Sequence, residues 1–304
     1  MRRGGRQLRM RLMLLREILK RATEEGWATG HFNVSEMDQM RAIVEACYEV
    51  GAPAIIGTSE GEAKHFGYAE AIALRDVFRE EYGIPIFLNA DHHKSVEAAK
   101  KAVDAGYDSV HIDLSALPFE ENLVGTKEIV DYARQFSIQH SAFSISVEGE
   151  LGYLRGESKI QKEKIEIQER DYTDPGQARE FVEKTGVDRL AIAVGNIHGI
   201  SLDEPALDIE RIRAIRQAIP ENVALVLHAG SGIPDDQIRA AIDAGISNIH
   251  INTDIRVAYL KELKKTFVEK PDEAAMYKLD TPASLAMKEV LKEKLKLFGV
   301  VNKI

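Results

Sequence analysis

Three histidines far apart in the chain are the residues best suited to carry chemistry. His92, His198 and His228 each lie just past a short apolar, β-branched run. If these runs are neighbouring parallel strands, their carboxyl ends meet on one face of a sheet and the three imidazoles converge there. Three imidazole ligands with one coordination position left open form a catalytic divalent-metal site. A lone histidine at a strand end is more often structural, but three on adjacent loops favour the metal site.

Carboxylates accompany these histidines. Asp91 directly precedes His92, and Asp113 ends the next apolar run. Glu148 and Glu150 are two residues apart on an expected strand, so their side chains face the same side. That pair is either a solvated strand end or a source of metal ligands and acid–base groups. Asp113 is an alternative metal ligand.

The chain is organised as alternating strand-like and helical segments, which predicts an α/β fold, a closed (β/α)8 TIM barrel. The rival is an open doubly wound sheet, but no G-x-G-x-x-G follows the first strand. Several of the runs are almost continuously apolar, as expected for strands covered on both faces. The eight expected strands are 29–34, 54–58, 86–90, 109–113, 144–149, 189–194, 223–228 and 248–252.

Local signals suggest where helices begin and which loop has a function. Ser35, with Asp38 three residues later, resembles a capping box, and Ser95 is expected to cap a helix over 96–105. Residues 152–174 are long, polar and charged for a loop inside a compact domain. Because this loop follows the fifth strand on the expected catalytic face, it is predicted to be a mobile lid.

Composition limits the class of protein. The chain has 304 residues, of which 44% are hydrophobic and 29% charged, and its net charge of −9 argues against binding nucleic acid or an anionic membrane. The one cysteine, Cys47, allows no disulfide within the chain and is expected to be a buried thiol, so a reducing cytoplasm is the expected location. Residues 1–12 are interpreted as a disordered extension, and residues 13–304 as one barrel domain.

Other polar groups follow the expected strands. Asn33 and Ser59 follow the first two, and Gly230-Ser231-Gly232 and Asn252-Thr253 follow the last two. Barrel enzymes often bind phosphate at these last two loops, through backbone N–H groups and hydroxyls. Of the remaining histidines, His93 should point away from the site, and His111 could be structural or functional. His31, His65 and His140 are interpreted as structural or surface residues.

Seven segments in this order resemble the class II, metal-dependent ketose-bisphosphate aldolases of the fructose/tagatose-bisphosphate type. The resemblance extends over roughly residues 13 to 300, and the motifs together are far more specific than any one alone. The segments are Phe32-Asn33-Val34, Asp91-His92, Ile112-Asp113-Leu114-Ser115, Glu148-Gly149-Glu150-Leu151-Gly152, Tyr172-Thr173-Asp174-Pro175, Gly195-Asn196-Ile197-His198-Gly199 and Val226-Leu227-His228-Ala229-Gly230-Ser231-Gly232.

The resemblance implies roles for these residues. His92, His198 and His228 would bind catalytic Zn²⁺, and Asp91 would exchange the proton of the substrate C4 hydroxyl. Asp113 and Glu150 would bind a second or alternate divalent ion, and Ser59 would contact the aldehyde half of the substrate. The segments that would hold dihydroxyacetone phosphate are Gly199, Ala229-Gly230-Ser231 and His250-Ile251-Asn252-Thr253.

The chain departs from the family pattern in three places. His250 stands where asparagine is usual, and the Ala229-Gly230-Ser231-Gly232 order changes a backbone contact and a monovalent-cation site that the family pattern implies. Only Glu157 remains of two adjacent glutamates in the loop, and it is assigned as the proton shuttle for the ketone carbon. Arg256 is assigned as the partner of a second phosphate.

The resemblance therefore predicts zinc-dependent, reversible cleavage of a ketose 1,6-bisphosphate, with fructose favoured over its tagatose epimer, to dihydroxyacetone phosphate and glyceraldehyde 3-phosphate. A small phosphorylated sugar is the expected partner, and a homodimer or homotetramer the expected assembly. A Schiff-base aldolase is disfavoured, because Lys94 follows a metal ligand rather than lying in a strand. A zinc-dependent hydrolase and a non-catalytic sugar-phosphate-binding protein remain as alternatives.

Overall fold

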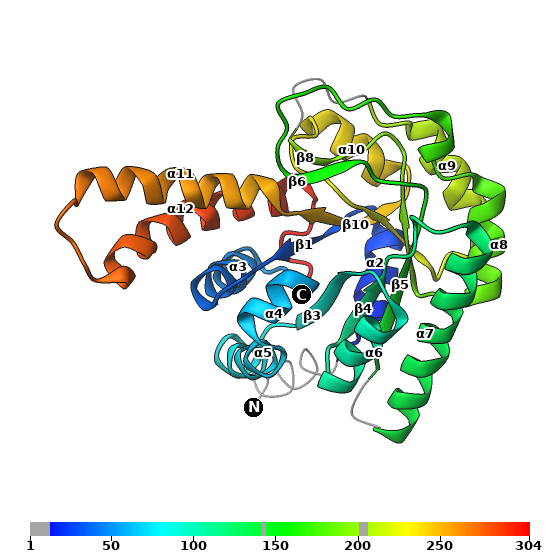
Figure 1. The fold of residues 1–304 in the computed structure, drawn as a ribbon, viewed down its shortest axis with the longest axis horizontal. Coiled ribbons are helices and arrows are strands. Elements are labelled where there is room, and N and C mark those ends of the chain that lie inside the picture. The colour runs from blue at the N-terminus through cyan, green and yellow to red at the C-terminus, as the bar shows by residue number, and fades with distance from the viewer. Residues whose placement is uncertain (1–12, 141–143, 201–205) are drawn as a thin grey trace.

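The described chain forms a closed barrel of parallel strands, as the sequence predicts. The structure is a computed structural model that describes residues 13–140, 144–200 and 206–304; the predicted extension over residues 1–12 lies outside them. Around the barrel the strand order is β1-β10-β9-β7-β5-β4-β3-β2, with every neighbouring pair parallel. Helices surround this barrel (Figure 1), which is the (β/α)8 architecture.

The barrel strands are β1 Thr29–Asn33, β2 Ala54–Ser59, β3 Ile86–His93, β4 Ser109–Ile112, β5 Ser146–Leu151, β7 Arg189–Ile192, β9 Ala224–Leu227 and β10 Ile246–Ile251. The helices are α2 Leu15–Glu25, α3 Met37–Val50, α4 Glu60–Phe66, α5 Tyr68–Tyr82, α6 Val96–Ala105, α7 Phe119–Gln139, α8 Pro175–Thr185, α9 Ile209–Ala218, α10 Asp235–Asp243, α11 Thr253–Glu269 and α12 Met276–Leu297, with a short 3-10 helix at Glu169–Asp171.

Two strands extend further toward the catalytic face than predicted. β3 continues to His93 instead of ending at residue 90, and β5 runs two residues later than expected, to Leu151. The predictions followed the apolar runs, but of the polar residues beyond them Asp91, His93 and Glu150 are also buried. Polar side chains can stay in a buried strand when they have partners. Here Asp91 is bonded by Asn33 of β1, His93 by Tyr68 of α5, and Glu150 lies next to His111 of β4.

One of the two predicted helix caps is confirmed and the other is wrong. The Ser95 hydroxyl accepts a hydrogen bond from the Ala98 N–H at 3.1 Å, at the start of α6. At α3 the cap is Glu36 rather than Ser35, because the Glu36 carboxylate accepts bonds from the N–H groups of Asp38 and Gln39, both at 2.8 Å. An ionised carboxylate is also favoured by the helix dipole at this end.

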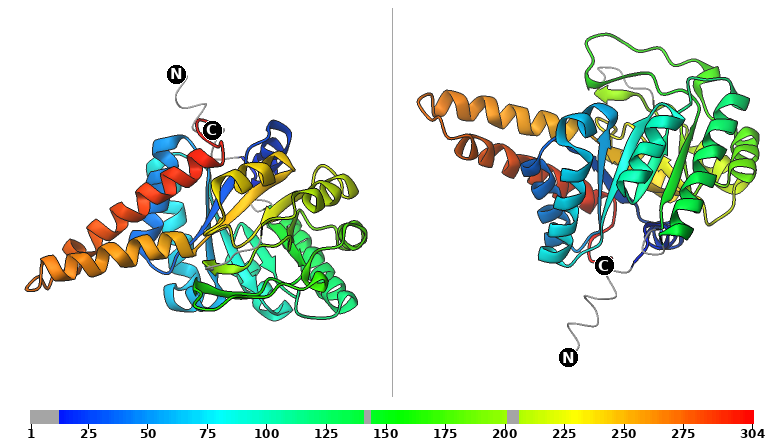
Figure 2. Two further views of the ribbon diagram at one scale, coloured as in Figure 1. Left: turned by 90° about the horizontal axis from the view of Figure 1, so that it is seen from above. Right: turned by 60° about the horizontal axis from the view of Figure 1, so that its bottom comes forward.

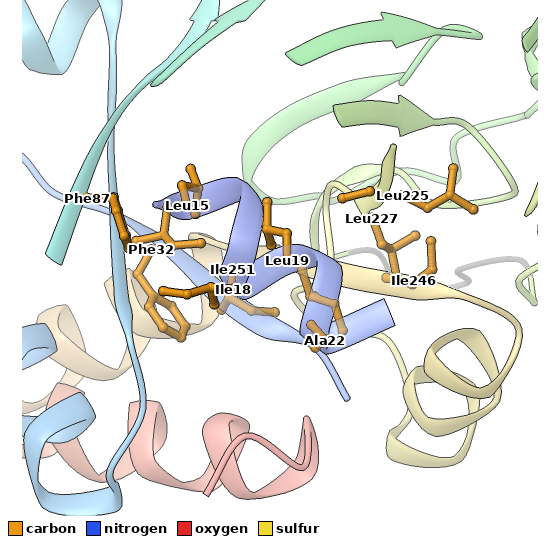
Figure 3. Packing of buried hydrophobic residues seen from close by; sticks show 14 of the residues in the cluster. Leu15, Ile18, Leu19, Ala22, Phe32, Phe87, Leu225, Leu227, Ile246 and Ile251 are labelled. Atoms are coloured by element: carbon orange, nitrogen blue, oxygen red, sulfur yellow. The ribbon is translucent and has the colours of Figure 1, made fainter. Parts of the chain in front are cut away.

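Helix α2 packs against β9 and β10. Its buried residues Leu15, Ile18, Leu19 and Ala22 line one face of the helix. Figure 3 shows this face near Leu225, Leu227 and Ile246 of those two strands.

Helices α11 and α12 pack against each other as a hairpin that projects away from the barrel (Figures 1 and 2).

The loop predicted to be a lid contains regular structure. Residues Gly156–Ile160 form strand β6, which pairs in parallel with β8, His198–Ile200, outside the barrel. All five residues of β6 are exposed. The loop after β5 is therefore tied to the segment that carries His198.

Cys47 is free and completely buried, as predicted. Burial raises the pKa of its thiol far above the usual value. In the described part of the chain, no helix is both long and apolar enough to cross a membrane.

The packing of α7 makes a prediction about stability. Ile129 is fully buried in this helix, whereas Ile138 is 81% exposed. Ile129→Ala should lower the free energy of unfolding by about 2–5 kcal/mol through lost burial and a residual cavity. Ile138→Ala, the matched control, should change it by less than about 0.5 kcal/mol. Denaturant unfolding of both variants measures this, and equal losses would contradict the packing described for α7.

Candidate active site

A pocket lies where the carboxyl ends of the barrel strands meet. Most of the residues predicted to do chemistry line it, although they come from segments spread over the whole chain. Its lining is Asn33, Asp91, His92, Ser158, His198, Gly199, His228, Ala229, Ser231, His250, Asn252 and Thr253.

An unusual backbone conformation places His92. Its φ is +44°, in the left-handed region, and the register of β3 against β4 shifts between Ala90 and His93. Such conformations cost free energy in non-glycine residues and concentrate at functional sites. The shift lets His92 enter the pocket, while the adjacent His93 turns away to Tyr68, with 3.1 Å between its Nε2 and the tyrosine hydroxyl. The outward direction predicted for His93 is therefore confirmed.

A chain of short contacts fixes the rings of His92 and His228. His92 Nδ1 lies 2.8 Å from Asp113 Oδ2, and His228 Nε2 lies 2.6 Å from Glu148 Oε1. The two remaining ring nitrogens, His92 Nε2 and His228 Nδ1, face each other at 3.0 Å. Each imidazole thus has one nitrogen held by a carboxylate and the other directed to a shared point.

This arrangement fits a divalent metal ion. Two nitrogens bound tetrahedrally to one zinc ion at about 2.0–2.1 Å would be roughly 3.4 Å apart, close to the separation of these two. A carboxylate on the second nitrogen of a ligating histidine is the usual means of fixing its orientation. Asp91 Oδ1 and Glu150 Oε2 are also buried without a hydrogen-bond partner among the described residues. Unpartnered buried oxygens of this kind suit a cation.

His198 is near this point but less closely grouped. Its ring centroid lies 5.0 Å from that of His92. The described residues form four groups in which three or more possible ligand atoms lie within 4.8 Å of one another. His198 belongs to none of these four groups. Burial, together with His92 and His228, lowers the pKa of His198 to about 3. The ring is therefore neutral at physiological pH, which is the state a metal ligand requires.

Asp91 is held with one oxygen in use and one free. Its Oδ2 accepts a hydrogen bond from Asn33 Nδ2 at 2.9 Å. Its Oδ1 lies 3.4 Å from His250 Nδ1. Burial alone would raise the pKa of Asp91, but His92, His111 and His250 outweigh that effect and hold the pKa well below its usual value. Asp91 is therefore a carboxylate at neutral pH.

Glu150 and His111 lie beside this group. Glu150 Oε2 is 3.8 Å from His92 Nδ1 and 3.2 Å from His111 Nε2. His111 Nδ1 accepts a hydrogen bond from the backbone N–H of His92 at 3.2 Å. His111, left open by the sequence, thus supports the strained backbone at His92. Asp113 and Glu150 together with His92 form one of the sets that could hold an ion.

The segments predicted to bind phosphate also border the pocket. Ala229 has φ +56°, and the Gly230 N–H donates to the His250 carbonyl at 2.9 Å. Ser231 Oγ accepts bonds from the N–H groups of Asn252 (3.3 Å) and Asp254 (3.1 Å), so it ties this turn to the beginning of α11. Ile251 is buried in β10 and is not among the residues that line the pocket. Gly199 lies on β8.

His250 occupies the position where the family pattern has asparagine. Its ring stacks on His31, with centroids 3.6 Å apart, and lies 3.9 Å from the ring of His228. Burial, with His228 and His31, lowers the pKa of His250 well below its usual value. His250 is therefore a neutral ring, able to exchange a hydrogen bond without adding charge. His31 is buried and structural, as predicted, whereas His65 and His140 are exposed.

Seven predicted residues do not line this pocket: Ser59, Asp113, Glu150, Glu157, Gly230, Ile251 and Arg256. Ser59 and Arg256 both contact Glu62: the Ser59 hydroxyl donates to Glu62 Oε2 at 2.9 Å, and Arg256 forms an ion pair with Glu62 Oε1. Glu157 is exposed and paired with Lys159 at 2.6 Å. It lines a neighbouring pocket together with His92, Asp113, Glu150 and His198.

Sequence reasoning gave no role to Asn196, Glu62 or Arg189, which help to organise the site. Asn196 accepts a bond from the Val194 N–H at 2.8 Å and donates to the His228 carbonyl at 2.9 Å, so it joins two histidine-bearing loops. Glu62 forms a capping box with Ser59 at the beginning of α4, and Arg189 pairs with Glu148. A Ser-x-x-Glu pattern in the sequence could have indicated Glu62, and Asn196 lies in one of the family motifs, whereas no motif contains Arg189.

Comparison with known proteins agrees with this geometry. The family model described as "Fructose-bisphosphate aldolase class-II" matches residues 13–303. The chain is 36% identical over 297 residues to a fructose-bisphosphate aldolase of Staphylococcus aureus, covering 97% of this chain and 99% of that protein.

Two solved structures extend this similarity. The YdjI aldolase from Escherichia coli K12 has a TM-score of 0.79 and 34% identity, covering 96% of this chain and 99% of the other. A putative fructose-1,6-bisphosphate aldolase from Coccidioides immitis has a TM-score of 0.78 and 27% identity, with coverage of 94% and 96%. The chain therefore belongs to the class II fructose-bisphosphate aldolase family.

Proposed function

We propose that this aldolase catalyses the zinc-dependent, reversible cleavage of a ketose that carries a phosphate on C1, giving dihydroxyacetone phosphate and an aldehyde. Fructose 1,6-bisphosphate, which would give glyceraldehyde 3-phosphate as the aldehyde, is the reference substrate suggested by the family. The observation that carries the proposal is the pair of nitrogens on His92 and His228, facing each other at 3.0 Å next to the Asp91 carboxylate.

In the cleavage direction the C3–C4 bond breaks. The C4 hydroxyl loses its proton and becomes the aldehyde carbonyl, while the bonding electrons pass to C3 and the C2 ketone as an enediolate. Asp91 Oδ1 is the proposed acceptor of that proton, since Asp91 lines the pocket and this oxygen has no hydrogen-bond partner among the described residues. Asn33, on the other oxygen, fixes the direction of the carboxylate. A proton delivered to C3, for which Glu157 is the proposed shuttle, completes dihydroxyacetone phosphate.

His92, His198 and His228 are the proposed ligands of the metal, with Asp113 and Glu150 available to an alternate position. When bound, the ion supplies Lewis-acid stabilisation of the negative charge that develops during cleavage. Asp113 and Glu148 hold the ligand rings in place, so little reorganisation is needed when the ion binds.

The phosphate on C1 is proposed to bind at Gly199, Ala229 to Ser231, and the beginning of α11. A helix N-terminus presents free backbone N–H groups and positive potential to an anion. Contacts with this phosphate are remote from the bond that breaks, so their energy can position the reacting carbons.

Removing the proposed base should affect turnover more than structure. Asp91→Ala should lower kcat by about 10²–10⁴-fold, the usual contribution of general acid–base catalysis. Thermal unfolding and the amount of bound metal should stay close to those of the unmodified protein. Turnover is measured by coupling triose phosphate formation to a reporter enzyme. Full activity of Asp91→Ala would remove Asp91 from the mechanism.

Metal removal tests the reaction class. Chelation should abolish cleavage of fructose 1,6-bisphosphate and of its tagatose epimer, and added Zn²⁺ should restore it. The ratio of the two rates gives the preference at C4. Release of inorganic phosphate without triose phosphates would instead support the zinc-dependent hydrolase. Binding of sugar phosphate with no turnover by the metal-loaded protein would support the non-catalytic alternative.

The support of His92 by Asp113 should be measurable as metal affinity. Asp113→Asn should weaken zinc binding by about ten- to a hundredfold, the usual effect of losing a carboxylate that orients a ligating histidine. Glu157→Gln is the matched control, because Glu157 lies in the same neighbouring pocket but is exposed and paired with Lys159. Competition with a chromophoric chelator measures both affinities. Equal affinities in the two variants would show that Asp113 does not support the metal site.

We also propose that the protein forms a homodimer or homotetramer in the cytoplasm. The α11–α12 hairpin supports self-association, since Phe267, Val268 and Tyr277 are exposed on it. Exposed apolar groups that gather on one surface commonly mark a protein interface. The single free, buried cysteine is consistent with a reducing compartment.

A further inference from the structure

The Glu62 carboxylate contacts both residues that are predicted to hold the aldehyde half of the substrate, Ser59 and Arg256. Its Oε2 accepts hydrogen bonds from Asn33 Nδ2 (2.9 Å), the Ser59 N–H (2.8 Å) and the Ser59 hydroxyl (2.9 Å). Its Oε1 forms an ion pair with Arg256 of α11. Ser59 and Arg256 are therefore both committed to this carboxylate.

The position of Glu62 is fixed by the fold. Only 7% of the residue is exposed, and it lies in the first turn of α4, where a capping box with Ser59 holds it. A carboxylate in the first turn of a helix is favoured by the free N–H groups and the dipole there. The contacts from Asn33, Ser59 and Arg256 hold the carboxylate group in place. Glu62 therefore has a fixed position in the site and is not a mobile surface group.

Asn33 shows on which side of the reacting carbons Glu62 lies. The same Asn33 Nδ2 donates to Asp91 Oδ2 and to Glu62 Oε2, each at 2.9 Å. Asp91 is the proposed base at the C4 hydroxyl, whereas the proposed C1-phosphate segments lie on β8, after β9 and at the beginning of α11. Glu62, after β2, is bound to Ser59, the residue that the resemblance assigns to the aldehyde half, and this contact places Glu62 on that side of C4.

A second phosphate at this end would meet an unfavourable site. A phosphate dianion has only acceptor oxygens, and the Ser59 hydroxyl, one donor that it needs, already serves Glu62. The Arg256 guanidinium, although partly exposed, is paired with the same carboxylate. Bringing the dianion to Arg256 also places it beside a buried carboxylate, and like charges in such a setting are costly. A sugar hydroxyl, in contrast, can donate to Glu62 and accept from Arg256 at the same time.

We propose that Glu62 determines substrate specificity at the aldehyde half, so that the enzyme favours a ketose 1-phosphate ending in hydroxyl groups over a ketose 1,6-bisphosphate. This inference rests on the proposed aldol cleavage and changes only the chemical class of the second product, which becomes an unphosphorylated hydroxyaldehyde. The Glu62 carboxylate would both repel a distal phosphate and accept a hydrogen bond from a sugar hydroxyl, and specificity commonly combines two such effects.

The test compares two sugars that differ only in the distal phosphate. We expect the zinc-loaded wild-type enzyme to cleave fructose 1-phosphate with a higher kcat/KM than fructose 1,6-bisphosphate. Glu62→Gln keeps an oxygen for Asn33 and Ser59 but releases Arg256 from its ion pair. It should shift the ratio of the two kcat/KM values toward the bisphosphate by about tenfold or more, the effect of removing one close like charge.

Glu60→Gln is the matched control. Glu60 lies in the same first turn of α4, but its carboxylate accepts a hydrogen bond from the Lys94 N–H. The contacts of Ser59 and Arg256 described above are with Glu62 and not with Glu60. It should leave the ratio of the two sugars unchanged. Glu62→Ala is a second variant that removes the carboxylate entirely, and it should shift the ratio in the same direction as Glu62→Gln.

A binding measurement separates this inference from the proposed function. In the Asp91→Ala background, calorimetric titration with the two sugars should show the same dependence on Glu62. If the zinc-loaded wild-type enzyme cleaves neither sugar but binding depends on the charge of residue 62, the aldolase proposal fails and the specificity inference stands. A wild-type preference for the bisphosphate, or a ratio that neither Glu62 variant changes by more than about threefold, overturns the inference.

Discussion

The ion pair between Arg189 and Glu148 inside the barrel is the interaction on which the site depends. Both side chains are completely buried, with 2.9 Å between Arg189 Nη1 and Glu148 Oε2. Neither charge could remain there alone, since an uncompensated buried charge is strongly destabilising. Arg189 holds the pKa of Glu148 well below its usual value, against the effect of burial. Glu148 therefore stays ionised and can hold His228, which in turn faces His92.

The same pair connects the site to the layer of polar side chains beneath it. Arg189 donates to Asn89 Oδ1 at 2.9 Å, and Ser109 donates to the same oxygen at 2.7 Å. Asn89 Nδ2 reaches His31, whose ring stacks on His250. Polar contacts of this kind in a low-dielectric interior connect the strands that carry them. The imidazoles at the carboxyl end of the barrel are therefore supported by strands that these contacts join.

The barrel fold and most of the pocket residues could be predicted from the sequence, because both depend on local patterns. Apolar runs mark strands, and the carboxyl ends of barrel strands converge by topology, so His92, His228 and Asp91 could be placed without coordinates. Contacts between distant segments could not be predicted in this way. The pairing of β6 with β8, the bridge made by Asn196 and the ion pair of Glu62 with Arg256 join residues between 32 and 194 positions apart. The Glu36 cap was missed for a different reason, since serine is the commoner cap and propensity favoured Ser35.

The balance of charge in the pocket explains why a metal ion and an anionic substrate belong together in an acidic protein. Five carboxylates, Asp91, Asp113, Glu148, Glu150 and Glu62, surround the strand ends, against the guanidinium groups of Arg189 and Arg256. Both guanidinium groups are already paired, and His198 and His250 are neutral because their pKa values are lowered. Against the effect of burial, the neighbouring carboxylates raise the pKa values of His92 and His111, so these two rings offset part of the negative charge. Without a cation the pocket would repel a sugar phosphate. A divalent ion at the proposed position between His92 and His228 would reduce that excess of negative charge and so favour binding of an anionic substrate.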